Sequence, residues 1–342
     1  MKTEINPKNI NNTGEFGLIN WIRKLSWKNK KTFIGIGDDA ACIEIDRNRF
    51  LLATTDTLQE GIHLNLQWNT PESAGRKLVS VNISDIASMG GRAEWCLLTA
   101  GLNGKLSLKW FQSFMGGIWN ETKKYGISIV GGDTVESPGK NYFSMTMMGT
   151  IEKNRVVLRS GAKPGDRIFV TGTTGDSSLG LEILKHYKNV KKVPEKLLCL
   201  VRKHLDPKPP AVLGRVLAEK GIPSAMIDIS DGLIQDICHI LDESGVGARV
   251  YANRIPLSSH YRKYVKKYSS DFFHMALNGG EDYELVFTAS GGSIALLSGI
   301  KNKLRRRITE IGEITRSNIK LLVNPDGKVE QLKSSGYQHF NK

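Results

Sequence analysis

The sequence predicts a mixed α/β protein built from two domains. Short apolar runs rich in β-branched residues alternate along the chain with longer stretches of helical character. The chain has 342 residues, enough for two domains, and 40% of them are hydrophobic, which suffices for packed cores. Midway, the segment 152–166 (EKNRVVLRSGAKPGD) is polar and rich in turn-forming residues. We therefore expect one domain over residues 1–151 and a second over residues 152–342.

Strands are expected wherever a short apolar run is bounded by polar or glycine-rich residues. In the first half these runs cover residues 32–37, 50–55, 127–132 and 142–151. In the second half they cover residues 167–172, 226–229, 248–252 and 283–289.

Helices are expected over the longer periodic stretches, which cover residues 71–90, 108–126, 177–188, 209–221 and 232–245. Pro71 and Glu72 suit the first turn of the first of these helices. The last three stretches close on Lys or Gly, as helix ends commonly do. Because helices and strands alternate in both halves, both domains are expected to be α/β, with mixed sheets.

The chain is strongly basic, with a formal net charge of +14. Its basic residues gather in three segments, 185–196, 261–268 and 301–307. None of these carries the interleaved aromatic residues of an RNA-binding sheet, and no zinc-finger spacing occurs. We expect solvated faces that could steer anionic ligands toward a site, and no nucleic-acid partner. A basic protein that binds nucleic acid remains the non-enzymatic alternative.

The cysteines and the hydropathy of the chain indicate its compartment. Its four cysteines form no CxxC pair and no regular framework, which favours a reducing, intracellular location. The first residues lack an apolar signal core, and no apolar run is long enough to span a bilayer. The sequence therefore predicts a cytoplasmic protein without a membrane partner.

Short motifs centred on carboxylates recur along this basic chain. They are GIGDD (35–39), TTDT (54–57), NISDIASMGG (82–91), GGDT (131–134), DISDG (228–232) and NGGEDYEL (278–285). Most follow directly on an apolar run, and we expect them to converge at one edge of a sheet. A single Asp-Gly pair is more often only a turn, but six such motifs favour a shared site. Oxygen ligands favour Mg²⁺ or Mn²⁺, and Mg²⁺ in turn suggests a nucleotide.

Familiar nucleotide motifs do not occur in the sequence. There is no GxxxxGK[ST] P-loop, and neither the H-R-D nor the D-F-G motif of protein kinases is present. Residues 170–184 have the order strand, glycine-rich turn and helix, which resembles a phosphate cradle but lacks its lysine. We favour a structural turn there, with a helix cap at Asp176 or Ser177.

Taken in order, the motifs resemble the thiamine-monophosphate kinase family. They are GEFGLI (14–19), GIGDDAA (35–41), TTDTLQEGIHL (54–64), VNISDIASMGG (81–91), GGDT (131–134), RSGAKPGD (159–166), IDISDGL (227–233), GGEDYEL (279–285) and GY-x-HF (336–340). They run from Gly14 to Phe340, almost the whole chain. The acidic motifs are shared with aminoimidazole ribonucleotide synthetase and selenophosphate synthetase. Another ATP-dependent member of that superfamily therefore remains an alternative.

The resemblance implies an architecture and a set of ligands. The fold would be that of the aminoimidazole ribonucleotide synthetase-like proteins, with an N-terminal domain for ATP, magnesium and dimerisation and a C-terminal domain that completes the substrate site. The N-terminal strands of two identical subunits would form a shared barrel, giving a homodimer. Several Mg²⁺ ions would be held by Asp39, Thr54, Thr55, Asp56, Asp85, Asp133, Asp228 and Asp231. ATP would contact Gly132, Asp133, Arg159 and Ser230, and thiamine monophosphate would contact His63, Glu281 and Tyr337.

The chemistry of phosphoryl transfer to a phosphate agrees with this site. The attacking oxygen would belong to a phosphate monoester, whose second pKa near 6 leaves it largely ionised, so no catalytic general base is expected. The obstacle is repulsion between two polyanions, which bound Mg²⁺ ions relieve. Arg159 suits bidentate phosphate binding, and Tyr337 suits the permanent cation of the thiazolium ring. His63, Glu281 and Tyr337 also have structural alternatives, as an ordinary histidine, a turn cap and a packed anchor. Asp38 has the structural alternative of supporting its neighbour Asp39 without binding a metal ion itself.

Overall fold

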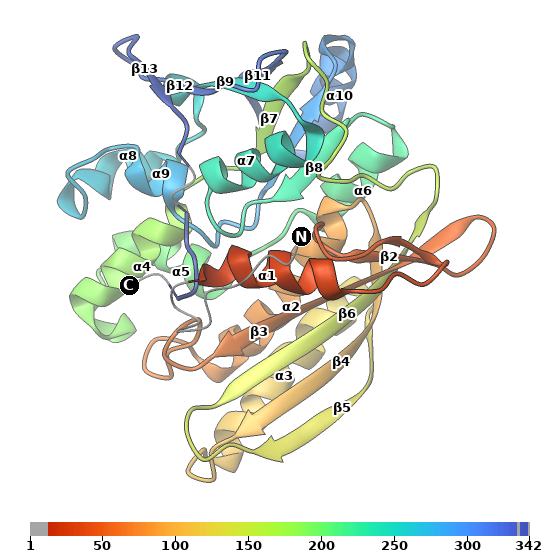
Figure 1. Ribbon diagram of the computed structural model, residues 1–342. Helices are drawn as coiled ribbons and strands as arrows, with labels where there is room; N and C mark the ends of the chain where they lie inside the picture. Colours follow the sequence, from red (N-terminus) through yellow and green to blue (C-terminus); the bar gives the residue numbers. More distant parts are fainter. Residues whose placement is uncertain (1–12, 334–335, 341–342) are drawn as a thin grey trace.

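The computed structural model describes residues 13–333 and 336–340, and these form two stacked halves, each built around one β-sheet (Figure 1). The first sheet has strand order β1-β2-β3-β6-β4-β5, and the second has order β13-β12-β9-β11-β7-β10-β8. Both are mixed: β4 and β5 are parallel, as are β12 and β9, whereas the other paired strands are antiparallel. The predicted mixed α/β class is confirmed.

The first half carries long strands and two long helices. Its strands are β1 (Thr32–Ile34), β2 (Ala41–Glu44), β3 (Arg49–Gln59), β4 (Arg92–Leu102), β5 (Ser128–Glu136) and β6 (Tyr142–Glu152). Its helices are α1 (Gly14–Leu25), α2 (Pro71–Ser88) and α3 (Leu108–Tyr125). Strands β2 and β4 and helix α1 are not among the expected elements. In β4, the polar residues Glu94 and Thr99 interrupt the apolar run, so the segment does not have the composition of a buried strand.

The second half has shorter strands and more helices. Its strands are β7 (Arg167–Thr171), β8 (Ala225–Asp228), β9 (Gly247–Tyr251), β10 (Leu285–Ala289), β11 (Ile308–Thr315), β12 (Lys320–Val323) and β13 (Val329–Gln331). Its helices are α4 (Asp176–Tyr187), α5 (Leu198–Leu205), α6 (Ala211–Glu219), α7 (Leu233–Ser244), α8 (Ser259–Tyr264), α9 (His274–Asn278) and α10 (Ile294–Leu304).

Helix α2 joins the two halves. Thr70 caps it by accepting a hydrogen bond from the Ser73 backbone N–H at 3.2 Å, and Pro71 follows in the first turn, as expected. The helix packs against α3 and the first sheet on one side and against α6 and β8 on the other. Because it is covered all round, it buries apolar residues together with polar ones such as Lys77 and Asn82. Its polar residues therefore need partners inside the protein.

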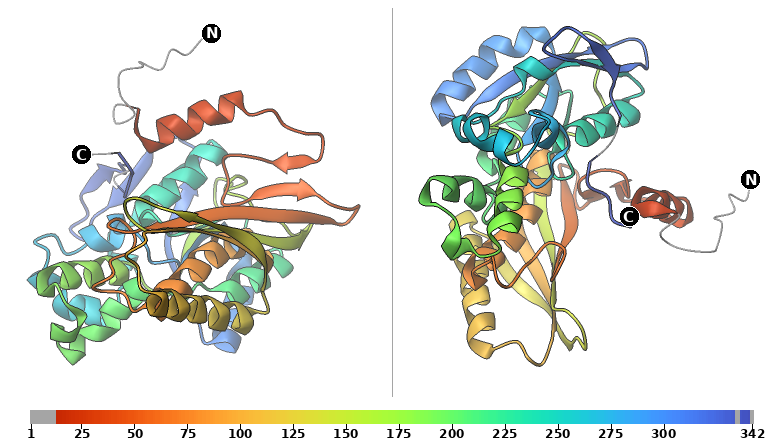
Figure 2. Two further views of the ribbon diagram at one scale, coloured as in Figure 1. Left: turned by 90° about the horizontal axis from the view of Figure 1, so that it is seen from below. Right: turned by 90° about the vertical axis from the view of Figure 1, so that its left-hand side faces the viewer.

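The first sheet has one covered face and one open face. Helices α2 and α3 cover one side, where the alternating buried residues of β6, from Phe143 to Ile151, enter the core. In the right-hand view of Figure 2 no described helix lies over the lower part of the other face. Large apolar side chains remain exposed there and on edge strand β5, including Trp95 at 39% and Val130 at 53%. Such a surface is typical of an interface between proteins.

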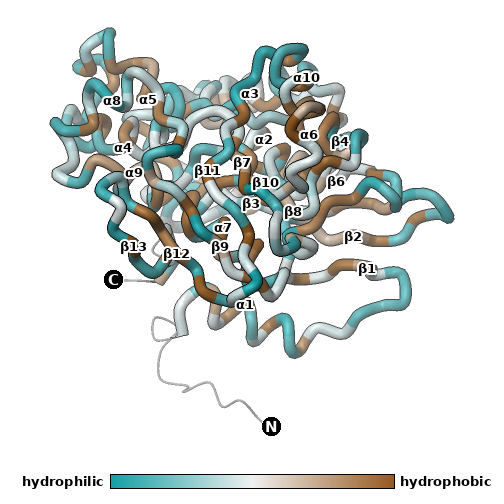
Figure 3. Tube along the Cα trace, turned by 90° about the horizontal axis from the view of Figure 1, so that it is seen from above, coloured by the Kyte–Doolittle hydropathy of each residue, from teal (hydrophilic) through white to brown (hydrophobic). Residues whose placement is uncertain are grey.

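Helix α1 lies on the surface of the protein without entering a core. Its sequence alternates apolar and polar residues, seen as brown and teal segments in Figure 3. None of its residues is fully buried, and Trp21, Ile22 and Leu25 remain exposed. It contacts the second half through Arg23, whose guanidinium pairs with Glu243 at 3.0 Å. Among the described helices, none combines the length and apolar character needed to cross a membrane.

Candidate active site

A cavity of about 500 Å³ opens between the two halves and is lined by residues from both. Eleven of the fourteen predicted site residues line it: Asp39, Thr54, Thr55, Asp56, His63, Asp85, Arg159, Ser230, Asp231, Glu281 and Tyr337. We call this cavity the cleft. The structure therefore brings together residues that lie up to about 300 positions apart in the sequence.

The carboxylates do not converge at the edge of one sheet, and that expectation is wrong. Asp56 lies inside β3, which continues to Gln59, because the strand does not stop at the polar Thr54–Thr55 pair. Asp85 comes from α2, and Asp228 ends β8 in the second half. Asp39 precedes β2. The acids thus gather where the first sheet, α2 and the second sheet meet.

Short hydrogen bonds fix the acids of this cluster across the two halves. The Thr54 hydroxyl donates to Asp85 at 2.6 Å, and the Ser84 hydroxyl donates to Asp228 at 2.6 Å. The second bond joins α2 to β8. It places Asp228 beside the cleft although this residue does not line it.

The electrostatics of the cluster are those of a site for cations. Burial and then repulsion from Asp231 and Asp39 raise the pKa of Asp56 to about 6. Burial, together with neighbouring carboxylates, also raises the pKa values of Asp85 and Asp228 well above the usual range. One buried oxygen of Asp39, Oδ2, has no hydrogen-bond partner among the described residues. Carboxylates held together in this way gain most from a shared divalent cation.

Arg159 approaches the same cluster. Its Nε donates to Asp39 Oδ1 at 2.9 Å, and its Nη2 contacts the same oxygen. Asp38 accepts from the backbone N–H groups of Asp39 and Arg159 at 3.0 and 3.1 Å, so it does orient its neighbour. The arginine therefore already lies at the cleft in a fixed orientation, as a phosphate-binding group should.

Thr55 contributes differently from Thr54. Side chains alternate along a strand, so the Thr55 hydroxyl points to the open face of the sheet, 3.4 Å from the Ser144 hydroxyl. Thr54 and Asp56 face α2 instead. Thr55 still borders the cleft, but its hydroxyl is directed away from the acids.

Gly132 and Asp133 lie apart from the cluster. In the register of the first sheet, Asp133 on β5 lies opposite Thr99 on β4. Thr99 lies opposite Ser144 on β6, and Ser144 lies opposite Thr57 on β3. Three strand spacings separate Asp133 from Thr57, about 14 Å in all. Asp133 therefore cannot share an ion with Asp56 of the same subunit.

The tail of the chain lines one side of the cleft through Tyr337 and His339. The Tyr337 N–H donates to the Asp231 carbonyl at 3.0 Å, and Gly336 packs so closely on that carbonyl that a Cβ would lie 2.6 Å from it. The rings of His63, Tyr337 and His339 meet there, with centroids 5.1 Å apart in the pairs His63–His339 and Tyr337–His339. Burial lowers the pKa of His63 to about 4, so its ring is neutral at neutral pH. This wall suits a cationic or aromatic ligand.

Several residues of the site were not predicted as site residues. His339 and Glu15 belong to motifs of the resemblance, but no role was assigned to them. Lys77 and His204 contact Glu281, and no local pattern marks them. Asp236 and His239 on α7 lie with Asp231 so that their ligand atoms fall within 4.8 Å of one another, close enough to share an ion.

The glycine-rich turn before α4 is structural, as favoured above, although its cap differs from the one expected. Gly175 is the N-cap residue and makes no side-chain bond. Asp282 supplies the cap instead, accepting from the backbone N–H groups of Gly175 and Ser177 at 2.6 and 3.2 Å. A carboxylate of the chain thus already occupies the anion site of this helix.

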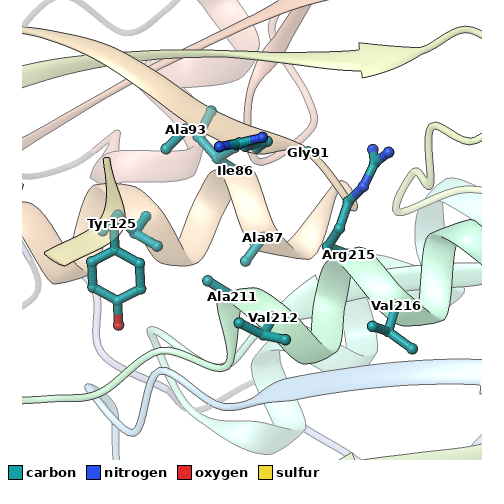
Figure 4. A pocket seen from close by; sticks show the side chains of 11 residues that line it. Ile86, Ala87, Gly91, Ala93, Tyr125, Ala211, Val212, Arg215 and Val216 are labelled. Carbon is teal, nitrogen blue, oxygen red and sulfur yellow. The ribbon is translucent and has the colours of Figure 1, made fainter. Parts of the chain in front are cut away.

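A second cavity, about 240 Å³ in volume, lies between α2 and α6 (Figure 4). It is lined mainly by apolar side chains such as Ile86, Ala87 and Val212, with Arg92 and Arg215 at its border. Arg215 is bound to Glu152 at 2.7 and 2.8 Å. Lacking a carboxylate cluster, this cavity does not share the chemistry of the cleft.

Comparison with known proteins identifies the family. A thiamine-monophosphate kinase of Buchnera aphidicola subsp. Acyrthosiphon pisum is 37% identical over 329 residues, which are 96% of this chain and 99% of that one. The chain belongs to the thiamine-monophosphate kinase family. The thiamine-monophosphate kinase of Escherichia coli K12 is 35% identical over 96% of this chain and 98% of its own. The resemblance seen in the motifs is thus confirmed.

Domain families and a solved structure agree with the membership in the thiamine-monophosphate kinase family. Residues 37–151 match the family "AIR synthase related protein, N-terminal domain", and residues 163–323 match "AIR synthase related protein, C-terminal domain". The structure described as "AaThiL complexed with AMPPCP and TMP" superposes with a TM-score of 0.84 at 33% identity and covers 98% of this chain and 100% of its own. The two-domain architecture expected from the resemblance is therefore confirmed.

Proposed function

We propose that this protein transfers the γ-phosphoryl group of ATP to thiamine monophosphate, giving thiamine diphosphate. The observation that carries the proposal is the cleft, where a buried carboxylate cluster adjoins an aromatic wall that ends in Glu281. The former suits phosphates with their metal ions, and the latter suits a cationic heterocycle. Relatives named thiamine-monophosphate kinase over nearly the whole chain, and a similar structure holding AMPPCP and TMP, support the same reaction.

The carboxylate cluster fits several Mg²⁺ ions. Asp39, with its unpartnered Oδ2, and the high-pKa acids Asp56, Asp85 and Asp228 supply oxygen ligands, and Asp231 extends the set. Thr54 through its hydroxyl and Thr55 through its backbone could add further oxygens. Bound Mg²⁺ would neutralise the phosphates and align donor with acceptor for in-line transfer.

The other residues of the site bind and orient the two substrates. Arg159 and Ser230 border the carboxylate cluster and would hold the phosphates of ATP. His63, Glu281 and Tyr337 would hold the thiamine part of the acceptor at the opposite wall. The acceptor phosphate is already ionised at neutral pH, so the chain needs only to bring its oxygen to the γ-phosphorus.

The position of Asp133 leads us to a homodimer. Since Gly132 and Asp133 lie on the exposed edge strand β5, they could complete only the site of a second subunit. Pairing two first sheets through their open faces would cover Trp95 and Val130 and build the shared barrel. Each ATP site would then use the partner's Gly132 and the partner's Asp133.

The domain boundary and location follow from the same proposal. We place the boundary between residues 151 and 152, so that residues 1–151 carry ATP, magnesium and the dimer interface and residues 152–342 complete the substrate site. All four cysteines are free thiols, which agrees with a cytoplasmic location.

The decisive test is detection of thiamine diphosphate by mass spectrometry after incubation with ATP, Mg²⁺ and thiamine monophosphate. We expect turnover with Mg²⁺ or Mn²⁺ and none in excess chelator, because the acids of the cleft then repel the substrates. Full turnover in chelator would exclude the metal sites. Turnover of an aminoimidazole precursor or of selenide in place of thiamine monophosphate would instead assign the protein to another branch of the superfamily. Retention of oligonucleotides without any ATP turnover would favour the nucleic-acid alternative.

Replacing Tyr337 with Ala should weaken the binding of thiamine monophosphate without weakening the binding of ATP. The ring borders the cleft, whereas the backbone of the tail is fixed separately to the Asp231 carbonyl, so the fold should survive. A lost cation–π contact predicts a rise of about 5- to 30-fold in the KM for thiamine monophosphate, equivalent to about 1–2 kcal/mol. Steady-state kinetics for each substrate and titration with a nonhydrolysable ATP analogue measure both effects.

Tyr337→Phe is the matched control, because it keeps the ring and should stay near the unmodified protein. If Tyr337→Ala loses nucleotide binding and keeps its KM for thiamine monophosphate, the tail belongs to the nucleotide site instead.

A further inference from the structure

Lys77 is a buried cation outside the predicted site. It lies on α2 with 1% of its surface exposed, and its Nζ is 2.8 Å from Glu281 Oε1. In the described part of the chain, no second carboxylate lies within 4.0 Å of it, and no aligned hydrogen bond reaches the ammonium. A buried ammonium without a compensating anion is strongly unfavourable. The charge of Lys77 is therefore balanced by Glu281 alone.

His204 holds the other oxygen of the same carboxylate. Its Nδ1 is 2.9 Å from Glu281 Oε2 and 3.2 Å from the Ser177 hydroxyl. Burial and the nearby Lys77 lower the pKa of His204, so the ring is neutral at neutral pH and donates through Nδ1–H. Lys77 comes from the first half of the protein and His204 from α5 in the second, so Glu281 is clamped between the two halves.

The backbone at Glu281 is shaped to present this carboxylate. Glu281 adopts φ of 64°, which is rare for a residue with a side chain. Its N–H donates to the Ser230 carbonyl at 2.7 Å, and a Cβ on the preceding Gly280 would lie 2.5 Å from the same oxygen. Strain of this kind persists where the surroundings over-determine a functional side chain.

We infer that Lys77 and His204 are positioning residues that fix Glu281 as an oriented hydrogen-bond acceptor for the amino group of the pyrimidine ring in the thiamine substrate. This inference rests on the proposed function. A carboxylate offers about four lone-pair positions. One is used by His204, and one oxygen faces Lys77, so acceptor positions remain toward the cleft. The amino group carries the N–H donors of thiamine, since the thiazolium ring has none on nitrogen.

The contacts with Lys77 and His204, together called the clamp, also keep Glu281 from acting as a general binding site for cations. Because Lys77 balances its charge, the pair is neutral as a unit and attracts cations in general only weakly. Burial alone would raise the pKa of Glu281, but Lys77 and His204 outweigh burial and hold that pKa well below the usual range. Glu281 therefore stays ionised throughout the neutral and weakly acidic pH range. Its selectivity for the amino group comes from the fixed orientation of its carboxylate oxygens.

The test compares Lys77→Met with Lys77→Arg, and His204→Phe with His204→Asn, whose amide can replace the Nδ1–H donor. Loss of a charge-assisted contact predicts that Lys77→Met raises the KM for thiamine monophosphate by about 10- to 100-fold, with the KM for ATP within about twofold. Lys77→Arg and His204→Asn should recover part of that loss. A thiazole phosphate that lacks the pyrimidine should not distinguish the variants. Lys328→Met, which removes a lysine paired with Glu330 at the surface, is the control.

The contacts of Glu281 with Lys77 and His204 can also be tested without any substrate, by measuring the ionisation of Glu281. Infrared difference spectra are recorded between proteins with and without the Glu281→Gln substitution, both in the otherwise unmodified chain and in Lys77→Met. In the unmodified protein Glu281 should stay ionised at pH values where an exposed glutamate is already protonated, whereas in Lys77→Met it should take up a proton at a higher pH, since burial then dominates. Unchanged titration in Lys77→Met overturns the clamp. If Lys77→Met raises the KM for ATP as much as the KM for thiamine monophosphate, while the titration of Glu281 shifts as expected, the role of Glu281 in recognising the pyrimidine is overturned. A protein that forms no thiamine diphosphate refutes the proposed function, and the infrared result still decides the clamp.

Discussion

Asp56→Asn should lower kcat by on the order of 10²-fold or more, the scale on which a lost electrostatic stabiliser acts. Asp56 lies inside β3 and faces the acids of α2 and the second half. Its backbone N–H is held by Asn82 at 3.2 Å, and Asn has nearly the shape of Asp, so the strand should remain in place. The loss then reflects the missing negative charge opposite the metal ions. Steady-state rates at saturating ATP and thiamine monophosphate measure it.

The same substitution should stabilise the metal-free protein at neutral and alkaline pH. Burial and repulsion raise the pKa of Asp56 to about 6 in the folded state, above its value in the unfolded chain. The folded state therefore binds protons more tightly, and the free energy of unfolding falls as pH rises through about 6. Asn carries no charge and removes this loss. Thermal unfolding in chelator from pH 5 to 8 should show a higher Tm for Asp56→Asn, by a margin that grows with pH.

Asp326→Asn provides the matched control, because Asp326 is exposed in the turn before β13 and its acceptor role toward the Lys328 N–H is kept by Asn. It should change neither rate nor the pH dependence of Tm. Near-normal activity of Asp56→Asn would place the metal site elsewhere. A lower Tm in chelator at pH 8 would mean that repulsion among the acids does not limit the stability of the apoprotein.

The sequence was sufficient for the parts of the site that local motifs build. Asp228 ends a buried strand, Ser230 and Asp231 follow on a short turn, and the sequence alone predicts this order. The motif around Glu281 was enough to identify this residue, but nothing in the sequence identified Lys77, the lysine that compensates its charge. A lysine within a predicted helix is ordinarily solvated, and only the burial of α2 between two sheets gives Lys77 another role.

Placement across the sheet could not be predicted in the same way. Asp56 and Asp133 follow similar apolar runs, yet the strand order puts one in the interior of the cleft and the other on an exposed edge. Strand order depends on long-range pairing, which local composition does not encode. The unexpected β4, which separates β5 from β6, is the reason that Asp133 lies far from Asp56.

Asp56→Asn and Asp133→Asn should complement each other when both chains are present in one dimer. Each variant alone should lose on the order of 10²-fold or more in activity, because every site then lacks one carboxylate. If Asp133 serves the neighbouring subunit, a mixed dimer contains one site with neither substitution and one site with both. A 1:1 mixture that exchanges freely should therefore recover about a quarter of the unmodified activity, since half of the dimers are mixed and each has one intact site.

The experiment coexpresses the two chains with different affinity tags and isolates the doubly tagged dimer, which should reach about half of the unmodified activity per dimer. If Asp133 acted within its own subunit, every site in every mixture would carry one substitution and no activity would return. Mixing Asp56→Asn with Asp85→Asn is the control, because both acids line the same cleft and serve the same subunit. Recovery of activity in that control would mean that Asp56 and Asp85 do not serve the same subunit. A doubly tagged dimer that cannot be isolated, with light scattering near the 37.9 kDa of one chain, would contradict the dimer itself. Strands β4 and β6 separate Asp133 on β5 from β3 in one subunit, and the open face of the sheet leaves room for a second subunit.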